Sequence, residues 1–349
     1  MKRLFVACAV TAAFAAAAPA TALAEDLAVV GSWSSLPLHN QFEKPFWEKT
    51  LPEASGGKIN VNLTTHNEMG LGVGDVFRML GDGVYDVAMT VGDYAVADAP
   101  ELEGLDVPLL ALDAETEKAA VDAARPMVED IFETRFNSHV LAIAPYPPQV
   151  VFCNKPISGL ADLKGLKIRA SGRMTAKFLE ALGAEGVNVS FSEVPGALQK
   201  GVVDCAVTGA GSGYSAGWWE VSSHLLTLPL GGWDPVVTAI NKDKWDSLSA
   251  EDRDMISTLI KSKFEDPAWA AADGALVNDV ACLTGKGECK SGEARSMVLV
   301  PASEADMATA RKILETEVLP DWAGRAGKDW AERWNASVGK VVNVSIPTD

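Results

Sequence analysis

The sequence predicts an α/β fold whose sheets are largely parallel. Short runs of β-branched residues alternate along the chain with segments in which apolar residues recur at helical spacing. This alternation is typical of strands that pair in parallel and are connected by helices covering the sheet. With 349 residues, 48% of them hydrophobic and 22% charged, the chain can form a sizeable core and about two domains of roughly 150 residues.

The first predicted elements show both periodicities clearly. A strand at 27–32 precedes a helix at 40–51, in which Phe42, Phe46 and Trp47 recur at helical spacing. An alternating strand at 58–65 follows Gly57, a short helix covers 75–80, and a further strand covers 85–91. A long helix is predicted at 115–136, and we expect Pro126 to kink or split it, because proline removes an intrahelical hydrogen bond.

The alternation continues beyond the long helix. Strands are predicted at 139–144, 149–153, 167–170, 187–191 and 202–208. Helices at 174–182 and 192–200 end at Gly183 and Gly201, residues that suit the left-handed position after a helix. Ser249, three residues before Asp252, is close to a capping box and begins a helical pattern that could continue, with an interruption at Pro267, to about residue 282. Helices at 303–319 and 322–338 complete the chain.

The N-terminus has the features of a cleavable secretory signal peptide. Lys2 and Arg3 precede an Ala-rich apolar run of about 15 residues, which ends before the small residues Ala22 and Ala24. The run is too short to cross roughly 30 Å of hydrocarbon. We therefore expect residues 1–24 to be removed on export.

Charge and cysteine content restrict the function classes. The 30 basic and 47 acidic residues give a net charge of −17, which argues against nucleic acid and anionic membranes as partners. Export leaves four cysteines, an even number that permits two disulfides. We expect Cys282 to pair with Cys289 across a short loop, worth about 2.5 kcal/mol on the chain-entropy model. A pairing of Cys153 with Cys205 stays open, and the scattered histidines give no metal-site spacing.

Two kinds of residue suggest a ligand site. Arg169 ends a predicted strand and Arg173 lies in the next loop, where side chains reach the crevice at the carboxyl edge of a parallel sheet. An arginine there can hold a carboxylate through two parallel hydrogen bonds, although a surface ion pair is the ordinary alternative. Trp33, Trp218 and Trp219 lie at strand ends or in loops, where aromatic rings either line a pocket or pack in the core.

A third motif suggests catalysis and is weaker. The segment 213–217 reads Gly-Tyr-Ser-Ala-Gly and matches the nucleophile elbow of the α/β-hydrolases. That family places an acid and then a histidine after the serine, but only His224 follows Ser215 and no aspartate lies between them. A glycine-rich loop that opens a helix is the favoured interpretation, and a secreted serine hydrolase using Ser215 is kept as an alternative.

Three segments of the chain resemble a known family. DLKGLKIR at 162–169, FSEV at 191–194 and ALQKGVVD at 197–204 are similar, in order and spacing, to the solute-binding proteins of TRAP (tripartite ATP-independent periplasmic) transporters of the C4-dicarboxylate type. The resemblance implies a two-lobed periplasmic-binding-protein fold in which each lobe is a mixed sheet flanked by helices. Hinge strands and a long helix would span both lobes. Lobe I would comprise 25–148 plus about 235–275, and lobe II about 149–234 plus 276–349.

The same resemblance implies the roles of the site residues. Arg169 matches the position that forms a salt bridge with the ligand carboxylate. Thr208 occupies the place of a ligand-contacting asparagine, and Gln149 lies nearest to a position that is basic in many relatives. We expect Trp218 and Trp219 to wall the pocket. Further candidates that contact the ligand are Arg173, Trp33, Glu68 and Tyr94.

The sequence therefore predicts a monomeric periplasmic protein without catalytic activity or cofactor. It would capture a small organic acid or zwitterion and deliver it to the membrane permease subunits of a TRAP transporter. A ligand-sensing subunit of a signalling system is the other alternative beside the hydrolase.

Overall fold

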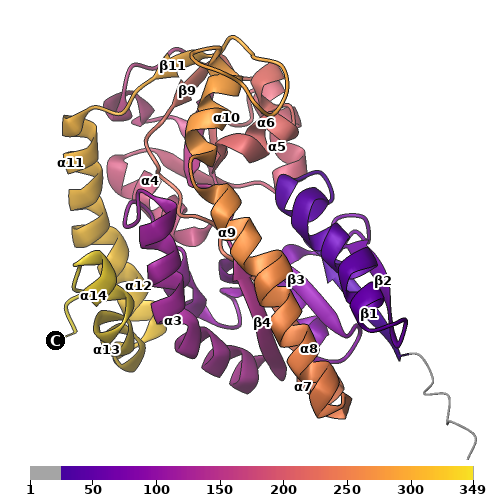
Figure 1. Cartoon of the computed structure of the whole chain (residues 1–349). Helices are drawn as coiled ribbons and strands as arrows, with labels where there is room; N and C mark the ends of the chain where they lie inside the picture. The colour runs from indigo at the N-terminus through magenta and orange to yellow at the C-terminus, as the bar shows by residue number, and fades with distance from the viewer. Residues whose placement is uncertain (1–24, 349) are drawn as a thin grey trace, which may run out of the picture.

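Two mixed β-sheets with helices around them form the framework of the protein (Figure 1). The computed structural model describes residues 25–348, so the expected signal peptide lies outside the described residues. The first sheet has the order β2-β1-β3-β10-β4 and the second β11-β9-β5-β8-β6-β7. The strands of the first are β1 (Glu25–Gly31), β2 (Ile59–Thr65), β3 (Val87–Val91), β4 (Ser138–Ala144) and β10 (Val236–Asn241). Those of the second are β5 (Gln149–Cys153), β6 (Lys167–Ala170), β7 (Glu185–Asn188), β8 (Cys205–Gly209), β9 (His224–Leu226) and β11 (Val298–Val300).

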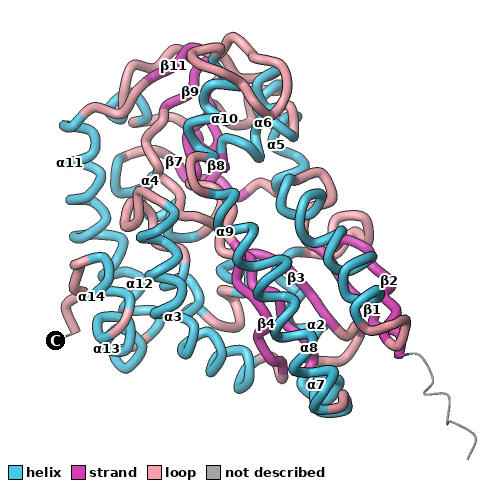
Figure 2. Tube along the Cα trace, in the orientation of Figure 1, coloured by secondary structure: helices cyan, strands magenta, loops and turns pink. Residues whose placement is uncertain are grey.

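Helices surround both sheets (Figure 2). They are α1 (Leu51–Ala54), α2 (Val76–Gly81), α3 (Ala114–Arg135), α4 (Arg173–Leu182), α5 (Val194–Gln199), α6 (Ala210–Ser215), α7 (Lys242–Ser247), α8 (Ala250–Ile260), α9 (Asp266–Ala272), α10 (Ala275–Thr284), α11 (Glu304–Ile313), α12 (Leu319–Ala326), α13 (Lys328–Ala336) and α14 (Val338–Val342). Wider π-helical turns make 37–54, 250–272 and 304–326 continuous helical runs. Within the described chain, no helix combines the length and apolar character that a bilayer crossing requires.

The sheets are mixed, so the expectation of largely parallel sheets is wrong in part. β1 pairs in parallel with β2 and β3, and β6 pairs in parallel with β7 and β8, as alternation predicts. β10, however, is antiparallel to β3 and β4, and β5 is antiparallel to β8 and β9. Both strands lie where the chain passes from one sheet to the other, and each enters its new sheet against the direction of its neighbours.

Two chain segments connect the sheets side by side. Residues 145–148 lead from β4 to β5, and residues 227–235 return from β9 to β10. The segments are hydrogen-bonded to each other, because Tyr146 N donates to Trp233 O at 2.9 Å and Gln149 N donates to Gly232 O at 3.2 Å. This paired crossing is the expected arrangement of hinge strands.

A third connection is helical. α8, α9 and α10 run from the first sheet to the second in Figure 1 and match the expected long spanning helix. Ser249 caps α8 as predicted, since Asp252 N donates to Ser249 Oγ at 3.1 Å. The expected interruption at Pro267 is wrong: this proline lies in the first turn of α9, where its missing N–H is tolerated. The break lies instead before α10, where Gly274 has a φ of 68°.

Two further helix expectations need correction. Pro126 does not split α3, which is one continuous helix with this proline inside it. Asp113 caps α3, because its carboxylate accepts from Thr116 N at 2.7 Å. The C-terminal helices break at Gly327, with a φ of 93°, instead of near residue 320. Trp322 Nε1 and Trp334 Nε1 donate to the backbone of the 3₁₀ segment Pro100–Leu105, beside α3. α11 and the turn after it pack on α4, so the C-terminal helices contact parts of the molecule next to each sheet.

Both cysteine pairs are disulfide-bonded. Cys282–Cys289 confirms the expected loop closure after α10. Cys153 and Cys205, whose pairing the sequence left open, are direct partners in the antiparallel ladder of β5 and β8 and form the second disulfide.

Candidate functional site

A cavity of about 490 Å³ lies where loops of the first sheet meet the edge of the second. Trp33, Asp93 and Tyr94 border it on one side and Arg169, Arg173 and Phe191 on the other. Four of these residues were predicted from the sequence: Arg169, Arg173, Trp33 and Tyr94. A volume of this size suits a small organic molecule.

Arg169 is the buried cation of this cavity. It lies at the end of β6 with 4% of its surface exposed. Its guanidinium donates from Nε to Val189 O at 3.0 Å and from Nη1 to Val207 O at 2.7 Å. Burial lowers the pKa of Arg169, while the nearby Tyr94 and Asp234 act in the opposite direction. A guanidinium carries five N–H groups and stays protonated, so the two backbone bonds orient it and further donors remain for a carboxylate.

Aromatic rings form a continuous row beside Arg169. The Phe191 ring lies 5.4 Å from the Trp33 ring and 5.3 Å from the Trp218 ring. Trp33 and Phe191 border the cavity, whereas Trp218 is fully buried behind Phe191 and does not. The Trp218 ring centroid is 6.0 Å from the Arg169 guanidinium carbon, so Trp218 supports the arginine from the side away from the cavity. Phe191 belongs to the FSEV segment, but its role in the site was not predicted.

The remaining predicted site residues do not border the cavity. Trp219 lies under the guanidinium of Arg295, 3.9 Å from its carbon, and donates to a backbone oxygen. Glu68 accepts from the hydroxyl of Thr65 at 2.6 Å. Thr208 is buried in β8 opposite a residue of β5. Gln149, also buried, donates from Nε2 to Asp234 Oδ1 at 2.9 Å.

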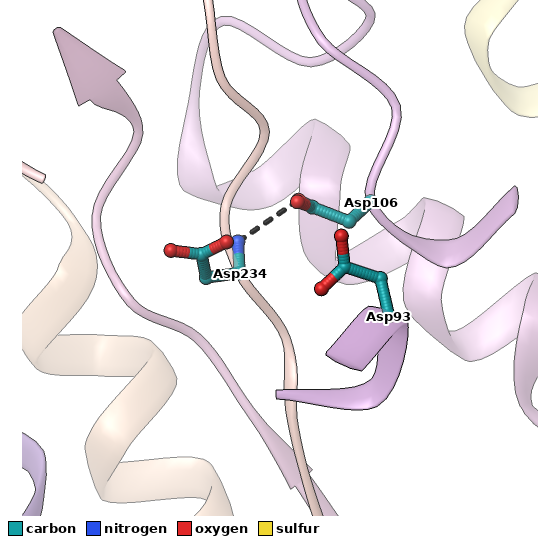
Figure 3. A group of neighbouring side chains, drawn as sticks. All are labelled: Asp93, Asp106 and Asp234. Atoms are coloured by element: carbon teal, nitrogen blue, oxygen red, sulfur yellow. Dashed lines mark hydrogen bonds between the residues drawn. The ribbon is translucent and has the colours of Figure 1, made fainter. Parts of the chain in front are cut away.

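Three buried aspartates gather beside Arg169 and were missed by the sequence analysis. Figure 3 shows Asp93, Asp106 and Asp234, whose carboxylate oxygens lie within 4.8 Å of one another. Asp106 Oδ1 accepts from Asp234 N at 2.9 Å, the dashed line in Figure 3. Among residues 25–348, this is the group of side chains whose oxygen atoms could coordinate a metal ion. Burial is the main cause that raises the pKa of each carboxyl, to about 6 for Asp106, and Asp106 raises the pKa of the other two further.

A glycine pair makes this cluster possible. A side chain at Gly232 would place its Cβ 1.9 Å from Asp106 Oδ1, and one at Gly231 would come within 2.6 Å of Gln149. The crossing segment can therefore approach the carboxylates only because these positions lack a side chain. The Gly-Gly-Trp-Asp sequence at 231–234 was the available signal, but its partners lie far away in the chain.

A second buried polar group lies behind Trp33. His66 packs edge-on against the Trp33 ring at 4.5 Å, and neither of its ring nitrogens has a hydrogen-bond partner. Burial lowers the pKa of His66 to about 4, so the imidazole is neutral near pH 7. His39 Nδ1 pairs with Glu43 Oε2 at 2.8 Å on the same side. His66 therefore packs against the Trp33 wall, and none of these three residues borders the cavity.

Ser215 does not have the geometry of a nucleophile elbow. That motif needs a serine at the sharp turn between strand and helix. Here β8 ends at Gly209 and α6 follows at once, so Ser215 is the exposed last residue of α6. The expected glycine-rich loop is itself the helix α6. Ser215 borders a second cavity, also of about 490 Å³, beside Tyr146 and Asp279.

The buried aspartates predict how stability changes with pH. Because the pKa of Asp106 is raised from 3.8 to about 6, the native state binds more protons than the unfolded state between these values. The free energy of unfolding should therefore fall as pH rises through this window, by up to about 1.4 kcal/mol per pH unit for this group. Asp106→Asn should make the free energy of unfolding fall less steeply with rising pH, as measured by urea unfolding at pH 4, 5, 6 and 7.

His66 provides the control for this experiment. The lowered pKa of His66 makes the free energy of unfolding rise with pH, because between about pH 4 and 6.5 the unfolded state binds the extra proton. His66→Gln should therefore steepen the decline with rising pH. If the free energy of unfolding of Asp106→Asn changes with pH in parallel with that of the wild type, the raised pKa of Asp106 is contradicted.

Comparisons with known proteins found a matching family model and several relatives. Residues 32–270 match the family model "Bacterial extracellular solute-binding protein, family 7". The chain is 27% identical over 206 residues to the 2,3-diketo-L-gulonate-binding periplasmic protein YiaO of Escherichia coli, covering 58% of this chain and 61% of the relative. It is 35% identical over 112 residues to the C4-dicarboxylate-binding periplasmic protein DctP of Vibrio cholerae, covering 32% and 33%. These alignments thus span less than two thirds of the curated relatives.

Solved structures extend the likeness to 90% of this chain. The Bordetella pertussis extracytoplasmic solute receptor DctP7, which binds pyroglutamic acid, has a TM-score of 0.79 at 22% identity, covering 90% of this chain and 99% of that one. A TRAP periplasmic solute-binding protein of Desulfovibrio salexigens with bound orotic acid has the same TM-score at 18% identity, covering 90% and 99%. At these identities the likeness concerns the two-lobed fold.

Proposed function

Because this chain belongs to the bacterial extracellular solute-binding proteins of family 7, we propose that it captures a small carboxylate-bearing solute between two lobes and delivers it to a TRAP-type permease. One observation carries the proposal: Arg169, buried and oriented by two backbone carbonyls, faces a cavity of about 490 Å³ between the two sheets. The N–H groups of Arg169 that its two backbone bonds leave free can donate to a carboxylate, whose geometry matches that of a guanidinium.

The two-sheet framework supports capture by lobe closure. We propose that residues 25–148 plus about 235–275 move as lobe I, and about 149–234 plus 276–349 as lobe II. The hydrogen-bonded crossing segments would form the hinge. Residues from both lobes border the cavity, so closure would enclose the solute and remove water from Arg169. The permease would then distinguish the closed, loaded form from the open one.

The remaining parts of the proposal follow from the same function. The protein would act in the periplasm after removal of residues 1–24, as a monomer, without cofactor and without a catalytic step. Trp33, Phe191 and Tyr94 would contact the solute, with Trp218 behind them. Gln149 and Thr208 would act through their neighbours, because neither borders the cavity in this structure.

Thermal unfolding against a panel of organic acids tests the proposed function. The purified protein, residues 25–349, is heated with mono- and dicarboxylates, keto acids, sugar acids, cyclic acids and zwitterions. A ligand present at 100 times its Kd should stabilise the native state by about 2.7 kcal/mol, which raises the Tm by several degrees. At least one acid should do so, while its uncharged amide should not. A panel without any stabilising acid, on protein shown by native mass spectrometry to be free of ligand, would contradict the proposal.

A further inference from the structure

A glycine lies where a segment of the second sheet touches a segment of the first. Gly172 follows β6 and is the N-cap residue of α4. Asp93 lies in the 3₁₀ turn Gly92–Ala95, directly after β3. A Cβ at position 172 would lie 2.2 Å from Asp93 Oδ2 and 3.3 Å from Asp93 Cγ, and the three nearest atoms beyond its chain neighbours all belong to Asp93. Position 172 is therefore crowded from across the cavity.

The local backbone does not require a glycine at this position. Gly172 has a φ of −139° and a ψ of 179°, an extended conformation that any residue adopts. At the N-cap of a helix, serine, aspartate and asparagine stabilise the first turn more than glycine does, yet α4 has no side-chain cap. The approach of Asp93 explains the glycine instead, because a side chain would occupy the place of the carboxylate.

Asp93 has little freedom to make room for a side chain. It is 6% exposed, and one of its carboxylate oxygens lies within 4.8 Å of an oxygen of Asp106 and of Asp234. Rotation of the carboxylate about its last bond would only exchange Oδ2 for Oδ1, and close packing opposes a different rotamer. The contact is steric, so it holds whether or not Asp93 carries a proton. A side chain at 172 is accommodated most easily if the two sides of the cavity move apart.

The contact belongs to the wall of the solute cavity. Asp93 and Gly172 both border the cavity that contains Arg169. Trp33 and Phe191, whose rings are 5.4 Å apart, form a second pair that joins the two sides at the same cavity. A rotation of the lobes about the crossing segments would break both contacts and open the cavity to solvent.

We propose that the contact between Gly172 and Asp93 is the closure contact of the two lobes, and that glycine at 172 permits full closure. Any side chain at this position would hold the lobes apart and weaken the binding of an enclosed solute. Gly172 is thus a positioning residue, which acts through the distance between the lobes. This inference rests on the proposed function, because it specifies how the lobes close.

A cysteine pair tests the contact without any solute. Because a Cβ at 172 lies 3.3 Å from Asp93 Cγ, the variant Asp93→Cys/Gly172→Cys should form a disulfide when the lobes are closed. The ligand-free variant, residues 25–349, is oxidised, and its radius of gyration is compared with that of ligand-free wild type by small-angle X-ray scattering. Mass spectrometry should show the 93–172 bridge, and the bridged form should be more compact. Absence of the bridge, or equal radii, would overturn the inference.

Gly172→Ala tests the consequence for binding by calorimetric titration with succinate, pyruvate, pyroglutamate and gluconate. For each of these acids that binds the wild type, Gly172→Ala should weaken binding about fivefold or more, the usual effect of an extra methyl group in a packed place. Its urea midpoint should remain that of the wild type, because opening of the lobes relieves the clash. Gly196→Ala in α5 is the control, since an added Cβ there meets no atom within 4 Å, and it should leave the Kd unchanged.

Removal of the Asp93 side chain should rescue the alanine variant. Gly172→Ala/Asp93→Ala should bind within about twofold of Asp93→Ala alone, because the methyl group then has room. The inference is overturned if Gly172→Ala binds as tightly as Gly196→Ala, or if its loss persists in the Asp93→Ala background, and the proposed function stands in both cases. Binding that survives Arg169→Ala, or failure of every organic acid to bind, contradicts the proposed function itself, and the cysteine pair then decides on the contact.

Discussion

Replacing Arg169 by Ala should lower the affinity for the carboxylate solute at least about 30-fold. The reason is that removal of one partner of a buried, hydrogen-bonded charge pair costs about 2–5 kcal/mol. Arg169 meets both conditions, because it is 4% exposed and its orientation is fixed by Val189 O and Val207 O. The Kd of wild type and variant is measured by calorimetry with the acid that stabilises the protein most.

Two further variants show whether charge alone explains the loss. Arg169→Lys keeps the charge but not the planar pair of donors, so it should recover only part of the affinity. Arg173→Ala removes an exposed cation from the same cavity and should change the Kd by only a few-fold, because exposed charges are screened. Equal losses in Arg169→Ala and Arg173→Ala would mean that general positive charge, and no specific contact, attracts the solute.

The disulfide between Cys153 and Cys205 should contribute the larger share of cross-link stability. It closes a loop with a sequence separation of 52 residues, whereas Cys282 and Cys289 are separated by 7. On the chain-entropy model the first is worth about 4 kcal/mol and the second about 2.5 kcal/mol. The double variant Cys153→Ala/Cys205→Ala should therefore lower the free energy of unfolding by about 4 kcal/mol in urea, and Cys282→Ala/Cys289→Ala by the smaller amount.

The fold of the first variant should survive. Cys153 and Cys205 are neighbours in the hydrogen-bonded ladder of β5 and β8, which the backbone maintains without the bridge. Ligand binding should accordingly persist in both double variants, with the loss confined to stability. Equal stability losses in the two variants would show that loop length does not control the effect, and that local packing of the sulfur atoms does.

Local pattern predicted several strands and helix starts at their observed positions. β5 and β6 have the predicted bounds, and the predicted capping role of Ser249 is confirmed, because runs of apolar residues and caps act within a few positions. β10 was missed although all its residues are buried, since no covering helix precedes it and its neighbours β3 and β4 lie about a hundred or more residues earlier. The orientation of such a strand depends on tertiary contacts that periodicity does not contain.

In the candidate site, too, local sequence features predicted some residues, whereas residues brought together by tertiary contacts were missed. Arg169, Arg173, Trp33 and Tyr94, suggested by strand ends and by the resemblance, border one cavity. The aspartate cluster was not predictable, because Asp93, Asp106 and Asp234 come from three segments that are far apart in the sequence, and aspartates are ordinarily surface residues. Trp219 was expected at the pocket on its aromatic character, but it stacks with Arg295. A ring at a loop position can satisfy either role, and only its three-dimensional neighbours decide.

A crystal structure of residues 25–349 with the acid that raises the Tm most is the most direct test of a carboxylate receptor built on Arg169. We expect the acid between the two sheets, with its carboxylate within hydrogen-bond distance of the Arg169 guanidinium and its body against Trp33 and Phe191. An acid bound elsewhere, such as in the second cavity beside Asp279 and Ser215, with Arg169 still bonded only to the protein, would contradict it.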